Sequence, residues 1–100
     1  MRVAVAILNW NGSNLLQCYL PQVLEHTTYE GADVIVVDNA SDDDSREYVF
    51  SLGSRCQWLQ LDRNYGFAGG YNRAVAQLSH YDAVVLLNSD VAPASGWLEP

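Results

Sequence analysis

Four short stretches along the chain have the composition of strands; three are rich in valine, isoleucine or leucine, and the third in chain order sets Trp58 and two leucines among two glutamines. They occupy residues Arg2–Leu8, Ala32–Asp38, Gln57–Leu61 and Ala83–Leu87. Continuous runs of this length are typical of strands that are buried on both faces, as in parallel sheets covered by helices. The pattern therefore predicts four strands of one buried, mostly parallel sheet.

The segments between these runs carry apolar residues at helical spacing. After the polar turn Asn9–Gly12, Ser13 or Asn14 is expected to cap a helix that continues to His26. A second helix is expected to have Ser41 as its N-cap and to end at Gly53. Its first turn would hold three acids, which the helix dipole favours there, namely Asp42, Asp43 and Asp44.

The third intervening segment is rich in glycine. A turn over Asn64–Gly70 is expected to lead into a helix whose Ala74, Val75 and Leu78 share a face. The last residues, Ser95–Pro100, have the composition of another helix opening. Alternation of strand and helix predicts an α/β fold of three layers, α/β/α, with a mostly parallel, doubly wound and Rossmann-like sheet.

The length of 100 residues is enough for one domain, which we assign to residues 1–100. The net charge is −7 and the chain contains no lysine, so a basic nucleic-acid-binding face and lysine-dependent catalysis are excluded. Cys18 and Cys56 stand alone and are expected to be reduced, partly buried thiols.

No apolar stretch approaches the roughly 18 residues of a membrane span, and no signal peptide is evident. We expect a cytoplasmic location and leave open whether a longer parent protein associates with a membrane.

Polar side chains follow all four predicted strands, at the edge where doubly wound sheets bind ligands. Asp38 ends the second strand and could hold a base or ribose, or simply cap the next helix. Asn88-Ser89-Asp90 follows the fourth strand, and its oxygen atoms could hold Mg²⁺ or Mn²⁺ together with substrate phosphates, or form a turn. Trp10 follows the first strand and could stack on a base or sugar, or pack half-buried, whereas Trp58 and Trp97 are expected in the core.

The most informative stretch is Arg63–Asn72, which reads RNYGFAGGYN. Its glycines would let the backbone approach a ligand, and the following helix N-terminus favours an anionic group. Arg63 places a cation beside this anion site. Tight packing of a helix on a sheet explains one glycine well, but three less well.

Together, these segments resemble the family-2 glycosyltransferases of the GT-A fold. The resemblance rests on four ordered blocks that read AILNWNG at Ala6–Gly12, VVDNAS at Val36–Ser41, NYGFAGGYN at Asn64–Asn72 and LLNSDV at Leu86–Val91. Gly96-Trp97-Leu98 continues it. The resemblance covers essentially the whole chain and implies the nucleotide-sugar-binding N-terminal part of such an enzyme.

The resemblance also implies roles for the site residues. Asp38 would hold a uridine or deoxythymidine base, next to Asn39, and the nucleoside pocket would be lined by Asn9, Trp10 and Asn11. The diphosphate or donor sugar would lie near Arg63, Asn64, Gly69, Gly70 and Asn72. Asn88-Ser89-Asp90 occupies the D-x-D position, where a divalent metal bridges protein and diphosphate. Here Asn88 replaces the first Asp and brings no charge, so Asp90 is the expected metal ligand.

The implied reaction is inverting transfer of a sugar from a UDP- or dTDP-sugar to an acceptor hydroxyl. The base of this reaction is expected downstream of Asp90, so we assign no catalytic residue within the chain and expect weak donor binding without sugar transfer. The acceptor half would be absent. The sheet edge and apolar surface that it would cover could then be exposed and lead to self-association.

Three other functions fit the alternation of strands and helices. A non-catalytic nucleotide- or carbohydrate-binding module is the main alternative. A receiver-type signalling domain would need paired acids after the first strand and a lysine, where this chain has Asn9 and Asn11 and no lysine. A nucleotidyltransferase would open with a glycine-rich, basic loop that residues Asn9–Asn14 do not provide.

Overall fold

A computed structural model describes residues 1–89 of the chain. All the described strands belong to one parallel sheet in the order β3-β2-β1-β4. The strands are β1 (Val3–Asn9), β2 (Ala32–Asp38), β3 (Gln57–Gln60) and β4 (Ala83–Leu87). The sequence predicted each of them to within one residue at either end. The expected helix at Ser95–Pro100, together with Trp97 and Asp90, lies outside the described residues.

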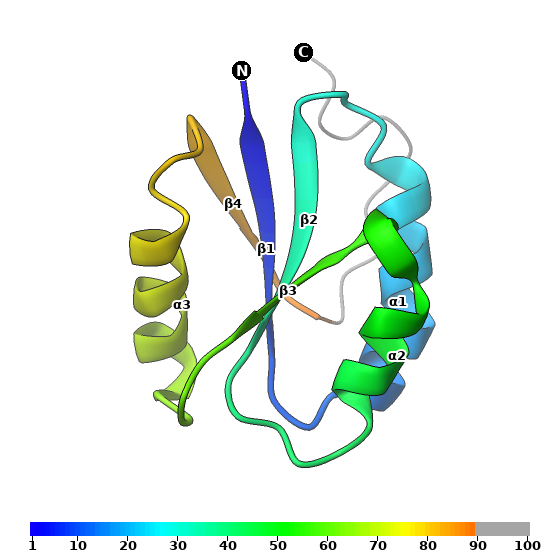
Figure 1. The fold of residues 1–100 in the computed structure, drawn as a ribbon, viewed down its shortest axis with the longest axis vertical. Helices are drawn as coiled ribbons and strands as arrows, with labels where there is room; N and C mark the ends of the chain where they lie inside the picture. The colour runs from blue at the N-terminus through cyan, green and yellow to red at the C-terminus, as the bar shows by residue number, and fades with distance from the viewer. Residues whose placement is uncertain (90–100) are drawn as a thin grey trace.

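Helices cover both faces of this sheet, as Figure 1 shows. Helices α1 (Ser13–His26) and α2 (Ser45–Ser51) lie on one face, and α3 (Gly66–Gln77) lies on the other. The chain proceeds from β1 outward to β2 and β3, then crosses back to place β4 on the other side of β1. Strand order therefore reverses between β1 and β4, which confirms the doubly wound, three-layer prediction.

Each face of the sheet has its own apolar cluster. The face toward α1 and α2 packs larger side chains, among them Ile7, Leu16 and Leu20. The face toward α3 is built around fully buried alanines at positions 4, 6 and 74. Because alanine is small, α3 can approach β1 closely, and this brings the N-terminus of α3 to the carboxyl edge of the sheet.

The predicted starts of the first two helices were wrong, α1 beginning earlier and α2 later than expected. Helix α1 begins at Ser13 with Gly12 as its N-cap, so neither Ser13 nor Asn14 caps it. Helix α2 begins only at Ser45, with Asp44 as its N-cap, so Ser41 is not a cap. The acids expected in the first turn of α2 instead precede it, as residues 42–44.

Asp43 explains why these helices begin where they do. Its carboxylate accepts hydrogen bonds from the Ser45 N–H at 3.0 Å and the Ser45 hydroxyl at 2.5 Å, and from the Ser13 N–H at 3.1 Å. One side chain thus satisfies backbone donors at the beginning of both helices. Although partial burial works in the opposite direction, the hydrogen bonds from Ser45 and Ser13 hold the pKa of Asp43 below its ordinary value.

The glycine-rich segment differs from its prediction as well. The expected turn over Asn64–Gly70 ends at Tyr65, because α3 begins at Gly66. Gly66 has a φ of +75°, a backbone conformation that favours glycine. Gly69 and Gly70 lie inside the helix, where the absence of a side chain serves close packing and not a turn.

The expectations for the isolated cysteines and Trp58 were partly correct. Both thiols are free; Cys56 is buried, but Cys18 is exposed on α1. Burial raises the pKa of the Cys56 thiol to about 12, so this sulfur stays protonated at neutral pH. Trp58 is half-buried at the border of the core, on the edge strand β3.

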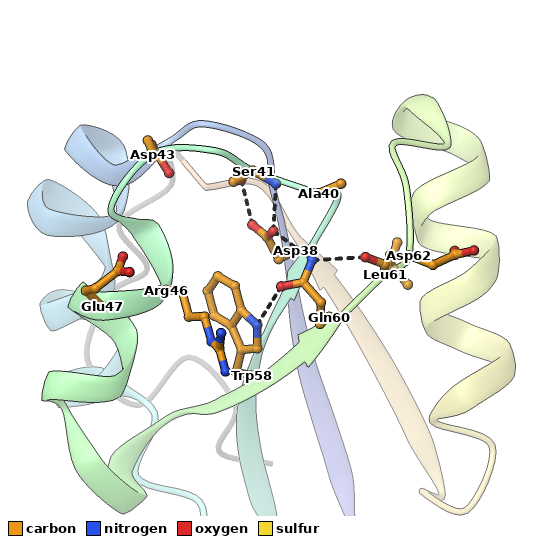
Figure 2. A pocket seen from close by; sticks show the side chains of 10 residues that line it. All are labelled: Asp38, Ala40, Ser41, Asp43, Arg46, Glu47, Trp58, Gln60, Leu61 and Asp62. Carbon is orange, nitrogen blue, oxygen red and sulfur yellow. Dashed lines mark hydrogen bonds between the residues drawn. The ribbon is translucent and has the colours of Figure 1, made fainter.

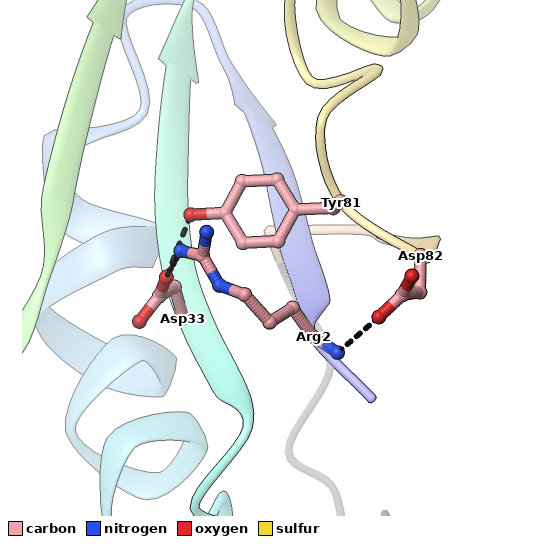
Figure 3. A network of polar contacts seen from close by, with 4 residues as sticks. All are labelled: Arg2, Asp33, Tyr81 and Asp82. Atoms are coloured by element: carbon pink, nitrogen blue, oxygen red, sulfur yellow. Dashed lines mark hydrogen bonds and ion pairs between the residues drawn. The ribbon is translucent and has the colours of Figure 1, made fainter.

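A polar cluster closes the sheet at the end opposite its carboxyl edge (Figure 3). The Tyr81 hydroxyl donates to Asp33 at 2.6 Å, and the Arg2 guanidinium lies 3.3 Å from the same carboxylate and over the Tyr81 ring. The Arg2 N–H donates to Asp82 at 2.6 Å. These contacts join β1, β2 and the loop before β4, so they fix the strand order at the amino end.

Among the described residues, no helix is both long and apolar enough to cross a membrane.

Candidate functional site

The parallel register brings polar side chains from three strands together at the carboxyl edge of the sheet. Asn9 pairs with Asp38, and Asp38 pairs with Gln60. Asp38 is buried, and its carboxylate accepts hydrogen bonds from Asn9 Nδ2 at 2.9 Å and Gln60 Nε2 at 3.2 Å. It also accepts the Ser41 hydroxyl at 2.6 Å and the Ser41 N–H at 2.8 Å (Figure 2). The structure therefore surrounds this carboxylate with protein donors.

Ser41 connects the loops that follow β1 and β2. Its hydroxyl oxygen accepts the Asn11 N–H at 2.8 Å while it donates to Asp38. In return, the Asn11 side-chain oxygen accepts the Asp42 N–H at 2.8 Å. Asn11 and Ala40 have φ values of 48° and 67°, which are uncommon for residues other than glycine. Such strained backbone persists only where surrounding contacts hold it, and here the Ser41 contacts do so.

The Asn9 side chain has one polar atom that no protein group satisfies. Its Nδ2 donates to Asp38 and Ser41, but its buried Oδ1 has no hydrogen-bond partner. A Cβ atom at Gly12 would lie 2.6 Å from this oxygen. Glycine at position 12 is therefore required for the β1–α1 loop to pass over Asn9.

Asn39 holds the beginning of α3. Its buried side chain accepts the Tyr65 N–H at 2.9 Å and donates to the Gly66 carbonyl at 3.0 Å. Its backbone N–H donates to the Asn9 carbonyl at 2.8 Å. The amide of Asn39 is thus used to position the loop between β3 and α3 against β1 and β2.

A cavity of about 450 Å³ opens beside this network, on the α2 face of the sheet (Figure 2). Trp58 lies within it, and its indole N–H donates to Gln60 at 3.0 Å. Arg46 and Glu47 of α2 line the opposite wall, and Asp43 and Asp62 lie at its ends. This cavity contains three rim carboxylates and a single cation, so it is unsuited to a diphosphate.

A second cavity of about 250 Å³ lies at the same edge of the sheet, toward α3. It contains two of the most exposed aromatic side chains of the described chain, Trp10 at 57% and Phe67 at 68%. The rest of its lining is Leu8, Asn39, Asn64 and Gly66. This cavity joins the ends of β1 and β2 to the N-terminus of α3. Two exposed aromatic rings with flanking amides are suited to a flat, hydrogen-bonding ligand.

Arg63 lies just outside the second cavity and is held by an aromatic neighbour. Both Arg63 and Arg73 lie over the Tyr65 ring, with guanidinium carbons 5.0 and 4.3 Å from its centroid. The Tyr65 hydroxyl donates a short hydrogen bond to Asp62, which lowers the pKa of that carboxyl. Contact with Tyr65 raises the pKa of Arg63. The pair of arginines gives this corner of an acidic chain a local positive charge.

The other predicted site residues differ in whether their side chains are exposed or buried. Asn64 is exposed, and its Oδ1 accepts the Gly66 N–H at 2.7 Å. Gly70 is buried where a Cβ would lie 2.8 Å from Leu8, which favours the helix-packing interpretation of that glycine. Gly69 is half-buried and Asn72 is exposed on α3, while Asn88 is exposed directly after β4. Asp90, the expected metal ligand, lies outside the described residues.

Within residues 1–89, no group of three His, Cys, Asp or Glu side chains is arranged to hold a metal ion. The exposed Asn88 amide offers a neutral oxygen of the kind that Mg²⁺ or Mn²⁺ accepts. A metal at this edge would therefore depend on Asp90 and on phosphate oxygens for its charged ligands.

Sequence reasoning missed Phe67, Ser41 and Tyr71 as residues of the site. Ser41 follows Asp38 by three residues, a spacing at which a hydroxyl returns to a carboxylate in a turn. Phe67 stands among glycines at the start of a helix, where an exposed aromatic residue has few partners for packing. No local pattern could have placed Tyr71 in the site, because its hydroxyl donates to the carbonyl of Leu87, 16 residues away.

The fold and the site define an α/β domain of the doubly wound class, with its polar residues gathered where strand order reverses. The family model described as glycosyl transferase family 2 matches residues 4–100 of the chain. The chain therefore belongs to glycosyl transferase family 2, as its four sequence blocks predicted. No curated protein sequence matches the chain significantly.

Solved structures share this fold. One is a mannosyltransferase from Pyrobaculum calidifontis, in complex with GDP-Man and Mn²⁺, which is 23% identical to this chain with a TM-score of 0.80. The match covers 99% of this chain and 32% of the mannosyltransferase chain. TarS of S. aureus, residues 1–349 in complex with UDP, is 23% identical, with a TM-score of 0.73 over 90% of this chain and 28% of its own. The same TarS segment in complex with UDP-GlcNAc gives a TM-score of 0.74. The chain thus spans 27–32% of the length of these structures, and at this identity the likeness concerns the GT-A fold.

Proposed function

We propose that this chain is the donor-binding part of a glycosyltransferase that takes a nucleoside-diphosphate sugar. The donor would be a UDP- or dTDP-sugar, used for inverting transfer to an acceptor hydroxyl. The observation that carries the proposal is the cavity between Trp10 and Phe67, at the edge where strand order reverses. Membership of glycosyl transferase family 2 supports the reaction class.

The nucleoside base would enter between Trp10 and Phe67. Stacking of a base on an aromatic ring is worth about 1–3 kcal/mol, and it needs an exposed ring, as both of these residues have. The Asn64 side chain lies in the lining of the cavity, and its exposed amide nitrogen can donate to a base carbonyl. Uracil and thymine have two such carbonyls, which supports these bases.

The diphosphate would extend from this cavity toward Asn88. The N-terminus of α3 contains no acid in its first turn, so its helix dipole favours an anion there. Arg63 and Arg73 add positive charge at the same corner. Asn88 and Asp90 would hold the divalent metal, and a bound metal would stabilise negative charge on the departing diphosphate.

The similar structures support the same ligand class. The mannosyltransferase was solved with GDP-Man and Mn²⁺, and TarS with UDP-GlcNAc. The protein groups described above act by binding and orienting the donor, and the transfer step would use a base outside the described residues. The whole enzyme would thus be a glycosyltransferase whose donor-binding part is this chain.

Calorimetric titration with UDP, dTDP and ADP, each with Mn²⁺ and with EDTA, tests the proposal. We expect UDP and dTDP to bind more tightly than ADP, and Mn²⁺ to tighten binding of the diphosphates only while Asp90 is intact. The control is the Asp90→Ala variant, which should bind UDP equally with and without Mn²⁺. Binding with no metal effect in the unaltered chain would support a non-catalytic binding module, and equal binding of ADP would contradict the pyrimidine assignment.

A further inference from the structure

Tyr71 lies at the point where the sheet changes direction. It is 6% exposed on α3, and its hydroxyl donates to the Leu87 carbonyl at 3.0 Å. Leu87 is the last residue of β4 and precedes Asn88 directly. Burial raises the pKa of the Tyr71 phenol, and a hydrogen bond with the Leu8 backbone opposes that rise. The hydroxyl is therefore protonated at neutral pH and contacts the ends of both β1 and β4.

This position is where the two strands begin to separate. Within residues 1–89, the register between β1 and β4 ends at the pair Ile7 and Leu87, so no ladder contact between these strands holds Asn88. In an open α/β sheet, the ligand crevice forms where neighbouring strands diverge in this way. The Tyr71 hydroxyl donates to the carbonyl of Leu87, the β4 member of this last pair and the residue before Asn88.

The ring of Tyr71 has a second contact that leads to the second cavity, lined by Trp10 and Phe67 and called the base cavity from here on. It meets the Phe67 ring edge to face, with centroids 5.0 Å apart and planes at 83°. Phe67 is otherwise exposed and lines the cavity with Trp10. One side chain thus supports an aromatic wall of the base cavity and, through its hydroxyl, the strand end that leads to Asn88.

We propose that Tyr71 is a positioning residue of the donor site, whose hydroxyl sets the distance between the base cavity and the diphosphate-binding segment at Asn88. The proposal rests on the proposed function, because it assumes a ligand that spans both places. The ring and the hydroxyl have separable effects: the ring supports Phe67, and the hydroxyl places Leu87 and Asn88. Loss of the hydroxyl alone therefore affects a nucleoside diphosphate and spares a nucleoside.

The variant Tyr71→Phe keeps the ring and removes the hydroxyl. Titration of uridine and UDP, each with Mn²⁺, against this variant and the unaltered chain separates the two contributions. We expect the Kd for UDP to rise about fivefold, as for loss of one hydrogen bond, and the Kd for uridine to change less than twofold. Tyr81→Phe is the matched control, because it removes a partly buried hydroxyl hydrogen bond at the opposite end of the sheet and should change neither Kd.

Equal weakening of uridine and UDP, or no weakening of either, would overturn the role of Tyr71 while leaving the donor site intact. If the unaltered chain bound neither ligand, the proposed function itself would fail. A measurement that keeps the hydroxyl covers the case in which Tyr71→Phe does not fold. With 3-fluorotyrosine in the chain, the ¹⁹F signal of Tyr71 should shift further with UDP than with uridine, and identical shifts would also overturn the role.

Discussion

Replacing Asp38 with alanine is expected to lower the thermal midpoint of unfolding by roughly 15 °C. The carboxylate is buried and accepts four hydrogen bonds from Asn9, Ser41 and Gln60. Its removal leaves buried donors without partners, although it also relieves the cost of burying a charge. We expect a net loss of about 3 kcal/mol, and in a domain of this size each kcal/mol lowers the midpoint by about 4–8 °C. Circular dichroism during heating measures this midpoint.

Asp42→Ala is the matched control for this prediction. Asp42 lies in the same loop, but its side chain is exposed and only its backbone N–H takes part in the network. We expect its midpoint within a few degrees of the unaltered chain. If Asp38→Ala melted like the control yet lost UDP binding, Asp38 would act as a direct base ligand, as the family resemblance implied, and the structural role would be contradicted.

Replacing Trp10 with alanine is expected to weaken UDP binding by about 5- to 150-fold without lowering stability. The indole is 57% exposed, so it contributes little to the core. A stacked base is worth about 1–3 kcal/mol, which corresponds to that range of affinity. Calorimetric titration gives the affinity, and thermal unfolding of the same sample shows whether the fold is intact.

Phe50→Ala provides the comparison for Trp10→Ala. Phe50 is equally exposed, at 55%, but it lies on α2 beside Trp58 and away from the base cavity. The two variants remove aromatic rings of similar exposure from opposite faces of the sheet. An unchanged affinity in Trp10→Ala, or an equal loss in Phe50→Ala, would mean that the base does not stack on Trp10.

The two central strands, β1 and β2, could be read from the sequence because a strand buried on both faces is largely apolar along its length. The run Val34–Val37 is short, continuously apolar and β-branched, which favours a buried strand, and helix α1 follows from its regular spacing of Leu16, Leu20 and Val23. The helix beginnings were less predictable. Ser41 and Ser13 both have the chemistry of an N-cap, but the tertiary contacts of Asp38 and Asp43 determine where each helix begins.

The site was predictable as a location and less so in its details. Parallel strands bring their carboxyl ends to one edge, so Asn9, Asp38 and Asn88 had to lie there. Which of them face a ligand depends on side-chain contacts between distant segments. Asn39, for example, uses its amide to hold Tyr65 and Gly66, 26 and 27 residues away. The nucleotide-binding role of each of these residues remains a prediction.

The two cavities at the carboxyl edge give the central claim its sharpest test, because each contains one tryptophan. Trp10 lies in the cavity toward α3, and Trp58 lies in the cavity toward α2. Their indole N–H signals can be followed separately by ¹H–¹⁵N NMR while UDP is added. The account predicts that the Trp10 signal shifts and saturates while the Trp58 signal stays in place. A shift of Trp58 with Trp10 unchanged would place the nucleotide in the other cavity and contradict the account.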